Sequence, residues 1–132
     1  MDVRYEWRGS FGNEELNALH AEGFDHRPLD DDWRGQVEAH SLGWVVARDE
    51  IGRLVGFVNV AWDGGVHAFV LDTLVARDAR RQGIGRAVVA VAEREAHAAG
   101  CEWLHADYDD DLAAFYEDGC GFRPTPAGLI RL

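Results

Sequence analysis

The stretch from Leu42 to Val75 limits the choice of fold more than any other part of the sequence. Three runs rich in valine and aromatic residues, 42–48, 54–62 and 66–75, are separated by short turn sequences at 49–52 and 63–65. Runs of this kind favour strands, and turns of this length join neighbouring antiparallel strands. The middle of the chain is therefore predicted to be an antiparallel meander.

A helix and a further strand are predicted after the meander. In the segment 83–99, Ile84, Val88 and Val91 recur at helical spacing on one face, and Gly100 follows as a helix end signal. The run 101–108 reads as a strand. A crossover helix places the strand after it parallel to the strand before it.

The flanking segments add shorter elements. A strand is expected at 3–7, a helix at 13–21 capped by Asn13 and ended by Gly23, and a short helix after the aspartates at 30–32. Towards the end, the sequence predicts a helix at 112–118 and two short strands at 121–123 and 128–132. The fold class is therefore α/β with a mixed, mostly antiparallel sheet and one parallel β-α-β crossover. A doubly wound fold needs regular β-α alternation, which the middle of the chain lacks.

Composition narrows the function. The chain has 132 residues, 47% of them hydrophobic, which suits one domain spanning 1–132. A net charge of -11 argues against nucleic acid, because affinity for that polyanion depends on Lys and Arg. The mixed N-terminus does not resemble a signal peptide, and no apolar run is long enough for a membrane span. Cytoplasmic location is expected, and Cys101 and Cys120 are expected to be free thiols.

The segment 71–88 carries the clearest chemical signal. A strand is predicted to end at Val75 and a helix to begin near Gly83, and four of the 13 basic residues cluster there. They are Arg77, Arg80, Arg81 and Arg86. Helix N-termini present unpaired N–H groups, and glycine lets an anion approach them closely. The segment is therefore predicted to bind phosphate.

Known phosphate motifs fit this segment unequally. Nothing matches the Gly-x-x-x-x-Gly-Lys-[Ser/Thr] pattern of P-loops. In the dinucleotide pattern Gly-x-Gly-x-x-Gly, Val88 occupies the third position, although Asp107 mimics the acid that binds the ribose. A protein that binds another nucleotide, such as NAD, stays a minor alternative.

The sequence Arg80-x-x-Gly83-x-Gly85 resembles the [Gln/Arg]-x-x-Gly-x-[Gly/Ala] motif of the GNAT superfamily of N-acetyltransferases. The strand at 71–75 and the later pairs Phe115-Tyr116 and Gly121-Phe122 resemble that family too. The resemblance implies a GNAT-like sheet with helices on both faces. It also implies acetyl-CoA as the acyl donor and direct acetyl transfer to a primary amine of a small molecule or peptide.

The same resemblance implies roles for individual residues. Backbone amides of the turn would bind the pyrophosphate of acetyl-CoA, and the end of the preceding strand would bind the pantetheine arm. The turn comprises Arg80, Arg81, Gln82, Gly83, Ile84, Gly85 and Arg86, and the strand end comprises Thr73, Leu74 and Val75. The thioester would lie in a gap between the third strand and the parallel strand.

Tyr116 resembles the tyrosine that protonates the departing thiolate in this family. Gly121 follows it by five positions where many members have four, so one extra residue must be accommodated. Asp72 is the preferred general base, because the acceptor side adjoins its strand. The alternatives for the base are His67, His105 and Asp107.

Trp33 and Trp44 are candidates for the acceptor pocket, since indole and acidic groups suit a cationic amine. Both could instead fill the core. Asp109 stands where the family often has Asn and lacks an amide donor. No spacing of His and Cys predicts a metal site.

Two further possibilities concern the whole protein. The fold could serve as a non-catalytic acyl-CoA-binding or partner-binding module. The apolar end Leu129-Ile130-Arg131-Leu132 could pair with a second subunit in a homodimer.

Overall fold

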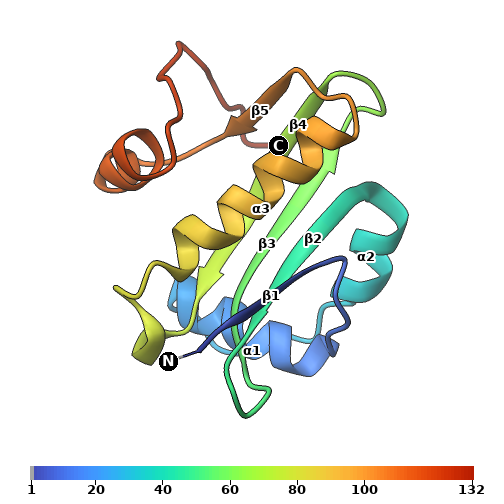
Figure 1. Ribbon diagram of the computed structural model, residues 1–132, viewed down its shortest axis with the longest axis vertical. Coiled ribbons are helices and arrows are strands. Elements are labelled where there is room, and N and C mark those ends of the chain that lie inside the picture. The colour runs from blue at the N-terminus through green and yellow to red at the C-terminus, as the bar shows by residue number, and fades with distance from the viewer. Residues whose placement is uncertain (1) are drawn as a thin grey trace.

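The protein is built on a five-stranded sheet in the order β1-β2-β3-β4-β5, as a computed structural model that describes residues 2–132 shows (Figure 1). The strands are β1 (Arg4–Trp7), β2 (Ser41–Arg48), β3 (Leu54–Trp62), β4 (His67–Val75) and β5 (Trp103–Ala106). The first four are antiparallel neighbours, and β5 is parallel to β4. The predicted fold class is confirmed, and the predicted bounds of β3 match the observed ones.

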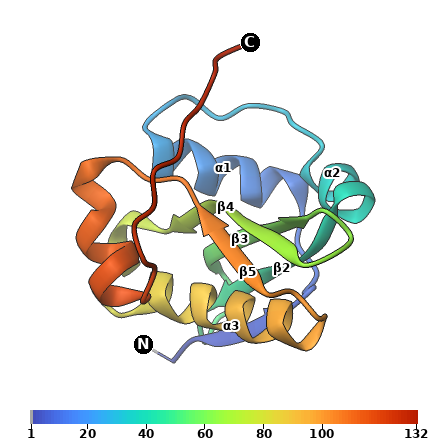
Figure 2. The ribbon, with the colours of Figure 1, turned by 90° about the horizontal axis from the view of Figure 1, so that it is seen from above.

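Helices cover both faces of the sheet, so that the sheet is the middle layer (Figure 2). The crossover helix α3 (Ile84–Ala98) packs on one face, and α1 (Asn13–Phe24) and α2 (Trp33–His40) pack on the other. Ile84 and Val88 of α3 are buried, as their helical spacing predicted, and Val91 is partly buried. These apolar stripes hold α3 firmly against the sheet.

The start of α1 differs from the prediction. Asn13 does not cap this helix; the backbone N–H of Gly12 donates to Oε2 of Glu15 instead, at 2.8 Å. The Asn13 side chain serves α2, because its Nδ2 donates to Asp32 Oδ1 at 2.9 Å and its Oδ1 accepts from the Arg34 N–H at 2.8 Å. Asn13 therefore joins two helices.

The predicted end of α1 is also wrong. The helix continues through Gly23 to Phe24, and Asp25 ends it in the left-handed conformation with φ 55°. A Cβ atom at position 23 would lie 2.9 Å from Leu74 Cδ2. Glycine is present there because α1 passes close to β4, not because the helix stops.

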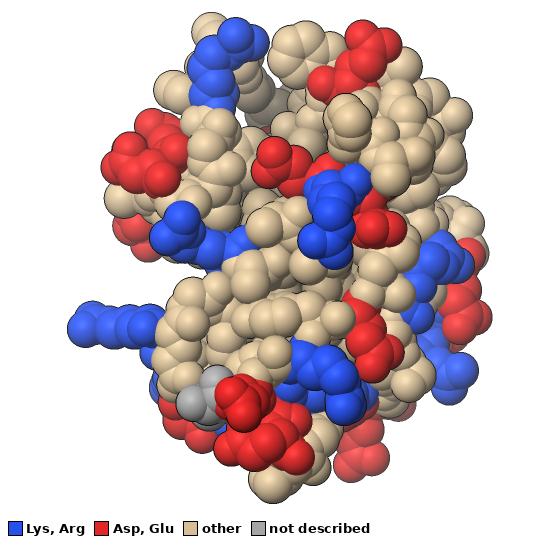
Figure 3. Space-filling view, in the orientation of Figure 1, with Lys and Arg blue, Asp and Glu red and all other residues tan. Residues whose placement is uncertain are grey.

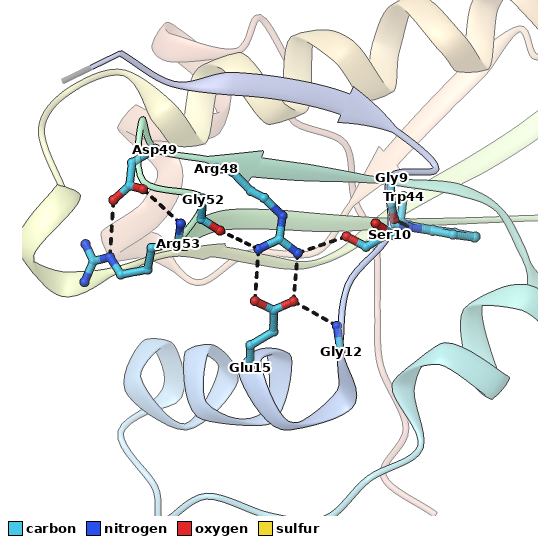
Figure 4. A network of polar contacts seen from close by, with 9 residues as sticks. All are labelled: Gly9, Ser10, Gly12, Glu15, Trp44, Arg48, Asp49, Gly52 and Arg53. Carbon is cyan, nitrogen blue, oxygen red and sulfur yellow. Dashed lines mark hydrogen bonds and ion pairs between the residues drawn. The ribbon is translucent and has the colours of Figure 1, made fainter.

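Arg48 and Glu15 clamp α1 to the sheet. The Arg48 guanidinium donates to both Glu15 carboxylate oxygens, at 3.0 and 2.7 Å, and to the carbonyl oxygens of Gly52 and Ser10 (Figure 4). Bidentate pairs of this kind are among the stronger polar contacts in proteins. The Arg48 contact holds the pKa of Glu15 below its usual value.

The C-terminal region is less regular than predicted. A 3-10 turn, η2 (Asp110–Leu112), and a π-helical turn, η3 (Ala114–Gly119), replace the expected helix at 112–118. The two strands predicted at 121–123 and 128–132 do not form, and Leu129 and Ile130 are 82% and 87% exposed. A strand needs a partner edge for its backbone hydrogen bonds, and these residues have none in the described chain.

Candidate active site

β4 and β5 stop pairing with each other partway along β4. Their pairing ends at Val70 with Ala106, whereas β4 continues to Val75 paired with β3 alone. The chain after β5 turns away from β4 towards the C-terminal helical turns (Figure 1). The predicted gap between the third strand and the parallel strand is therefore present, and residues 71–75 border it.

A β-bulge lies at this point of β4. Phe57 pairs with Leu74 and Asn59 with Leu71, so that Asp72 and Thr73 together oppose Val58. Asp72 has a left-handed backbone with φ 56°, which Asp tolerates better than most residues. Bulges re-aim side chains. Here Asp72 contacts α1 and Thr73 contacts η3.

Asp72 lies beside a histidine in a partly closed environment. Its Oδ1 is 3.5 Å from Nε2 of His20 on α1, and the two side chains are 23% and 21% exposed. Burial raises the pKa of the Asp72 carboxyl above its usual value, and the nearby His20 opposes that rise. A carboxyl with a raised pKa is better suited to take a proton from an amine.

Tyr116 lies on the other side of the bulge. Its hydroxyl donates to Oγ1 of Thr73 at 3.2 Å, and its ring stacks on Tyr108 with centroids 4.9 Å apart. Phe115 and Phe122 contact the ring edge-on. Burial raises the pKa of the Tyr116 hydroxyl, so the group is protonated at neutral pH and available as a proton donor.

The extra residue after Tyr116 is accommodated by the π-helical turn η3. A π-turn holds one residue more than an α-turn, and such turns are common at functional sites. The Phe122 N–H donates to the Tyr116 carbonyl at 2.9 Å, and the Gly121 N–H donates to the Glu117 carbonyl at 3.1 Å. The irregular spacing in the sequence thus has a local structural cause.

The turn between β4 and α3 has the backbone of an anion-binding loop. Arg81 and Gly83 both have positive φ, 65° and 79°, and Gly83 directly precedes α3. Alternation of this kind turns successive N–H groups towards one point, and a glycine cannot cap the helix with a side chain. The N-terminus of α3, the positive end of its dipole, therefore has no side-chain cap.

The two glycines of the motif have different surroundings. A Cβ at Gly83 would have no atom within 4 Å, whereas a Cβ at Gly85 would lie 3.0 Å from Phe115 Cε1. Gly83 leaves the approach to the turn open. Gly85 lets η3 pack against α3 beside Tyr116, a role that the motif alone did not indicate.

The four arginines around the turn differ in their contacts. The Arg86 Nε donates to the Gly119 carbonyl at 2.9 Å, and the Arg77 guanidinium donates to the Glu22 carbonyl at 3.3 Å. Arg80 and Arg81 are exposed. Figure 3 shows basic side chains projecting from the surface at the level where α3 begins in Figure 1.

A pocket of about 350 Å³ lies between α3 and η3, beside this turn. Its lining includes Gly83, Arg86, Ala90, Glu93 and Gly119. Its size falls within the usual range of small-molecule sites. It continues from the turn at 80–86 along the outer side of α3.

The two tryptophans considered for the acceptor pocket are both buried. Trp44 is 6% exposed and donates from its indole N–H to the Gly9 carbonyl at 2.8 Å. Trp33 is 7% exposed and donates to Asn17, but its ring also contacts His20, with centroids 5.1 Å apart. Trp33 thus borders the Asp72 region, whereas Trp44 packs with Phe11 in the core.

The remaining candidates for the base lie elsewhere on the sheet. His67 and His105 contact each other, with 2.8 Å between ring nitrogens, where β4 and β5 are still paired. Asp107, the third alternative, is exposed beyond the end of β5. Among these candidates, Asp72 alone lies at the bulge beside the gap.

Sequence reasoning missed the part of His20 and His26 in this site. His20 Nδ1 is 2.8 Å from His26 Nε2, and His20 also contacts Asp72. His20 shares a helix face with Leu16 and Leu19, which indicates only that it points inward. Its contact with Asp72 depends on where α1 crosses β4, and no local pattern encodes that crossing.

Comparisons with known proteins agree with this geometry. The family model described as "Acetyltransferase (GNAT) family" matches residues 5–122. An acetyltransferase from Trypanosoma brucei has a similar structure, with a TM-score of 0.82, 20% identity and 99% of each chain covered. No match is found among curated proteins.

Two other solved structures have named activities. Glucosamine-6-phosphate N-acetyltransferase from Arabidopsis thaliana is 15% identical, with a TM-score of 0.75 and 98% of each chain covered. An aminoglycoside N-acetyltransferase in complex with CoA is 16% identical, with a TM-score of 0.77; 99% of this chain and 94% of that one are covered. These likenesses show the shared fold.

The fold and the family match together define the class of protein. The chain belongs to the acetyltransferase (GNAT) family. Within residues 2–132, no helix is both long and apolar enough to cross a membrane, and no cluster of three potential metal ligands is found.

Proposed function

We propose that the protein is an N-acetyltransferase that uses acetyl-CoA and transfers the acetyl group directly to a primary amine. The observation that carries this proposal is the bulge of β4 at the gap. It directs Asp72 and Thr73 to different neighbours, and the hydroxyl of Tyr116 lies 3.2 Å from Thr73. A proton acceptor and a proton donor are thus held on either side of one strand end.

Asp72 is assigned the role of general base. Amine acceptors are ammonium ions near neutral pH, and nitrogen attacks a carbonyl carbon only after losing a proton. The raised pKa of Asp72 brings this carboxyl closer to the pH range in which such a proton can be accepted. Its contact with α1 turns it towards the side where the acceptor is expected.

Tyr116 is assigned the role of general acid. Formation of the C–N bond breaks the C–S bond, and the departing thiolate takes a proton from the hydroxyl. Thr73 Oγ1 and the stacked ring of Tyr108 orient that hydroxyl. The net reaction converts an ammonium ion and a thioester into an amide, a thiol and one released proton.

Acetyl-CoA supplies the acetyl group as an activated thioester. The residues that would hold it are the backbone amides of 80–86 and the strand end at 73–75. Three features fit a pyrophosphate: the positive φ of Arg81 and Gly83, the N-terminus of α3 and the exposed Arg80 and Arg81. The pocket along α3 provides room for the rest of the nucleotide.

The acceptor is proposed to be a small cationic amine or a peptide amine. Acidic residues outnumber basic ones 24 to 13, and the loop before α2 is rich in aspartate. Such a surface attracts cations. Two structural neighbours are N-acetyltransferases of glucosamine-6-phosphate and of aminoglycosides, which supports a small amine as the acceptor.

The direct test is a thiol-release assay with acetyl-CoA and a panel of polyamines, aminoglycosides, amino acids and peptide N-termini. We expect release that depends on at least one amine and yields the acetylated product by mass spectrometry. Binding of acetyl-CoA without turnover on any amine would favour the non-catalytic acyl-CoA-binding module instead.

A further inference from the structure

A chain of ring nitrogens runs from the surface to Asp72. His26 Nδ1 lies 2.6 Å from the Arg27 carbonyl oxygen, and His26 Nε2 lies 2.8 Å from His20 Nδ1. His20 Nε2 then lies 3.5 Å from Asp72 Oδ1. The order Arg27 carbonyl, His26, His20, Asp72 is continuous, and it lies outside the motifs that identify the family.

The carbonyl at one end fixes the hydrogen positions along this chain. A carbonyl oxygen can only accept, so His26 must carry its hydrogen on Nδ1. A neutral His26 then has a lone pair on Nε2, which requires His20 to donate from Nδ1. A neutral His20 in turn presents the lone pair of Nε2 to Asp72.

An ionised Asp72 offers only lone pairs, so the carboxylate and the neutral His20 would repel each other. One additional proton between Nε2 and Oδ1 removes this conflict. It makes either an imidazolium ion beside a carboxylate or a carboxylic acid that donates to imidazole. In both forms the pair binds one proton in common.

We infer that His20 and Asp72 act as a single proton-accepting pair in this enzyme, and that His26 is the positioning residue that sets its tautomer. This inference rests on the proposed function, because it takes Asp72 to be the base. In the resting enzyme the pair shares one proton. The base-active pair lacks that proton, takes one from the acceptor ammonium and later releases it to solvent.

The surroundings hold the His20 ring in this position. Phe24 and Trp33 contact it, with centroids 4.6 and 5.1 Å away. The charged groups on adjoining segments are engaged with one another: Glu22 accepts from the backbone N–H of Arg77, whose guanidinium lies 4.0 Å from Asp25. On the η3 side, the Tyr116 hydroxyl donates to Thr73.

Nitrogen NMR of the protein labelled in its histidines tests the tautomers without any need for activity. We expect His26 to be the Nδ1–H tautomer and His20 to carry hydrogen on Nδ1, with signals assigned from single-histidine variants. Finding His20 neutral with hydrogen only on Nε2, donating to Asp72, would overturn the inference. This readout stands even if no acceptor amine is found.

Two substitutions at His26 then test the consequence for catalysis. In His26→Phe, His20 is free to place its hydrogen on Nε2 and stabilise the Asp72 carboxylate, so Asp72 becomes a weaker base. We expect the acidic limb of kcat/KM to move about one unit to lower pH and the plateau to fall about tenfold. His26→Gln keeps an acceptor for His20 Nδ1 and should restore most of both.

The control is His97→Phe on the exposed side of α3, which should leave the profile unchanged. Equal pH profiles of kcat/KM for His26→Phe and His26→Gln would contradict the pairing of His20 with Asp72. Absence of acetyl transfer by the wild type would instead contradict the proposed function. The two failures are therefore distinguishable. The same amine is used throughout, so that its own ionisation cancels.

Discussion

At the scale of single residues, Asp72 combines a left-handed backbone conformation with a carboxyl that is largely buried. Its φ of 56° is rare for a residue other than glycine, and burial raises the pKa of its carboxyl. Strain of this kind is often found at functional sites and lowers stability locally. If Asp72 serves catalysis, its removal should cost activity but not stability.

The substitution Asp72→Asn tests whether the carboxylate lowers the stability of the folded protein. A raised pKa in the folded state means that the Asp72 carboxyl ionises less readily there than in the unfolded chain. Its ionisation therefore lowers the free energy of unfolding as pH rises above the unfolded-state pKa, and this loss is complete above the folded-state pKa. We expect Asp72→Asn to be more stable than the wild type by about 0.5–2 kcal/mol at pH 7, with the difference vanishing near pH 3. Urea unfolding at both pH values measures it. A variant less stable at pH 7 would contradict the account.

Tyr116→Phe isolates the proposed acid. The ring contacts with Tyr108, Phe115 and Phe122 stay, and only the hydroxyl bonded to Thr73 is lost. We expect kcat to fall about 10²-fold or more while acetyl-CoA binds as before. Tyr108→Phe, which removes a hydroxyl bonded to Glu117, is the matched control and should change kcat little. Similar losses in both variants would point to packing instead.

At the scale of elements, the site depends on how α1 is held against the sheet, because α1 carries His20 to Asp72. The Glu15–Arg48 clamp is the main polar contact of this kind described above. Because Arg48 lowers the pKa of Glu15, the clamp contributes stability above the unfolded-state pKa and loses it as pH falls through the lower, folded-state value.

Glu15→Gln should therefore lower the free energy of unfolding by about 1–2 kcal/mol at pH 7 and by less at pH 3. The estimate is modest because the Glu15 side chain is 35% exposed. Thermal or urea unfolding measures it, with the exposed neighbour Glu14→Gln as the control. An equal effect of Glu15→Gln at both pH values would show that the charge is not involved.

Local patterns predicted most elements because each depends on residues close in the sequence. The meander followed from valine-rich runs and tight turns, and α3 from the spacing of Ile84 and Val88. The strands expected at 121–123 and 128–132 failed because a strand also needs a partner edge, which sequence spacing does not reveal. The predicted ends of α1 were wrong for a related reason. The Asn13 side chain bonds to the start of α2, and Gly23 makes room for Leu74, so neither residue marks an end of α1.

In the candidate site too, some features follow from local sequence and others depend on how separate elements pack together. The turn at 80–86 could be predicted from charge and glycine placement, and Tyr116 from the family motif. The bulge at Asp72, the π-turn after Tyr116 and the contact of His20 with Asp72 arise from how separate elements meet. Trp33 and Trp44 illustrate the limit, because aromatic residues near acidic ones can equally fill a core, and both are buried.

At the scale of the whole molecule, the net charge of -11 favours a cationic acceptor and opposes anionic acetyl-CoA. The arginines around the β4–α3 turn offset that opposition locally. Salt screens long-range attraction, since the Debye length falls from about 30 Å at 0.01 M to about 8 Å at 0.15 M ionic strength. The two substrates should therefore respond differently to salt.

For a dicationic amine, we expect kcat/KM to fall several-fold, on the order of threefold to tenfold, when salt is raised from about 0.01 to 0.15 M. A monocationic amine of similar size serves as the comparison and should lose less. Initial rates at saturating acetyl-CoA measure both. Equal salt dependence for the two amines would show that the acidic surface does not guide the acceptor.

Binding of acetyl-CoA at the turn before α3 is the central claim, and calorimetric titration tests it most directly. Gly83 and Gly64 form a matched pair, because both have φ near 80° and open space where a Cβ would lie. The substitutions Gly83→Asp and Gly64→Asp therefore carry the same strain and charge, but Gly83 alone precedes α3.

We predict that the wild type and Gly64→Asp bind acetyl-CoA in preference to NAD, and that Gly83→Asp binds it at least about tenfold more weakly, since a carboxylate repels phosphate at the helix N-terminus. Failure of the wild type to bind acetyl-CoA at millimolar concentration, preference for NAD, or equal affinities of the two variants would contradict the claim.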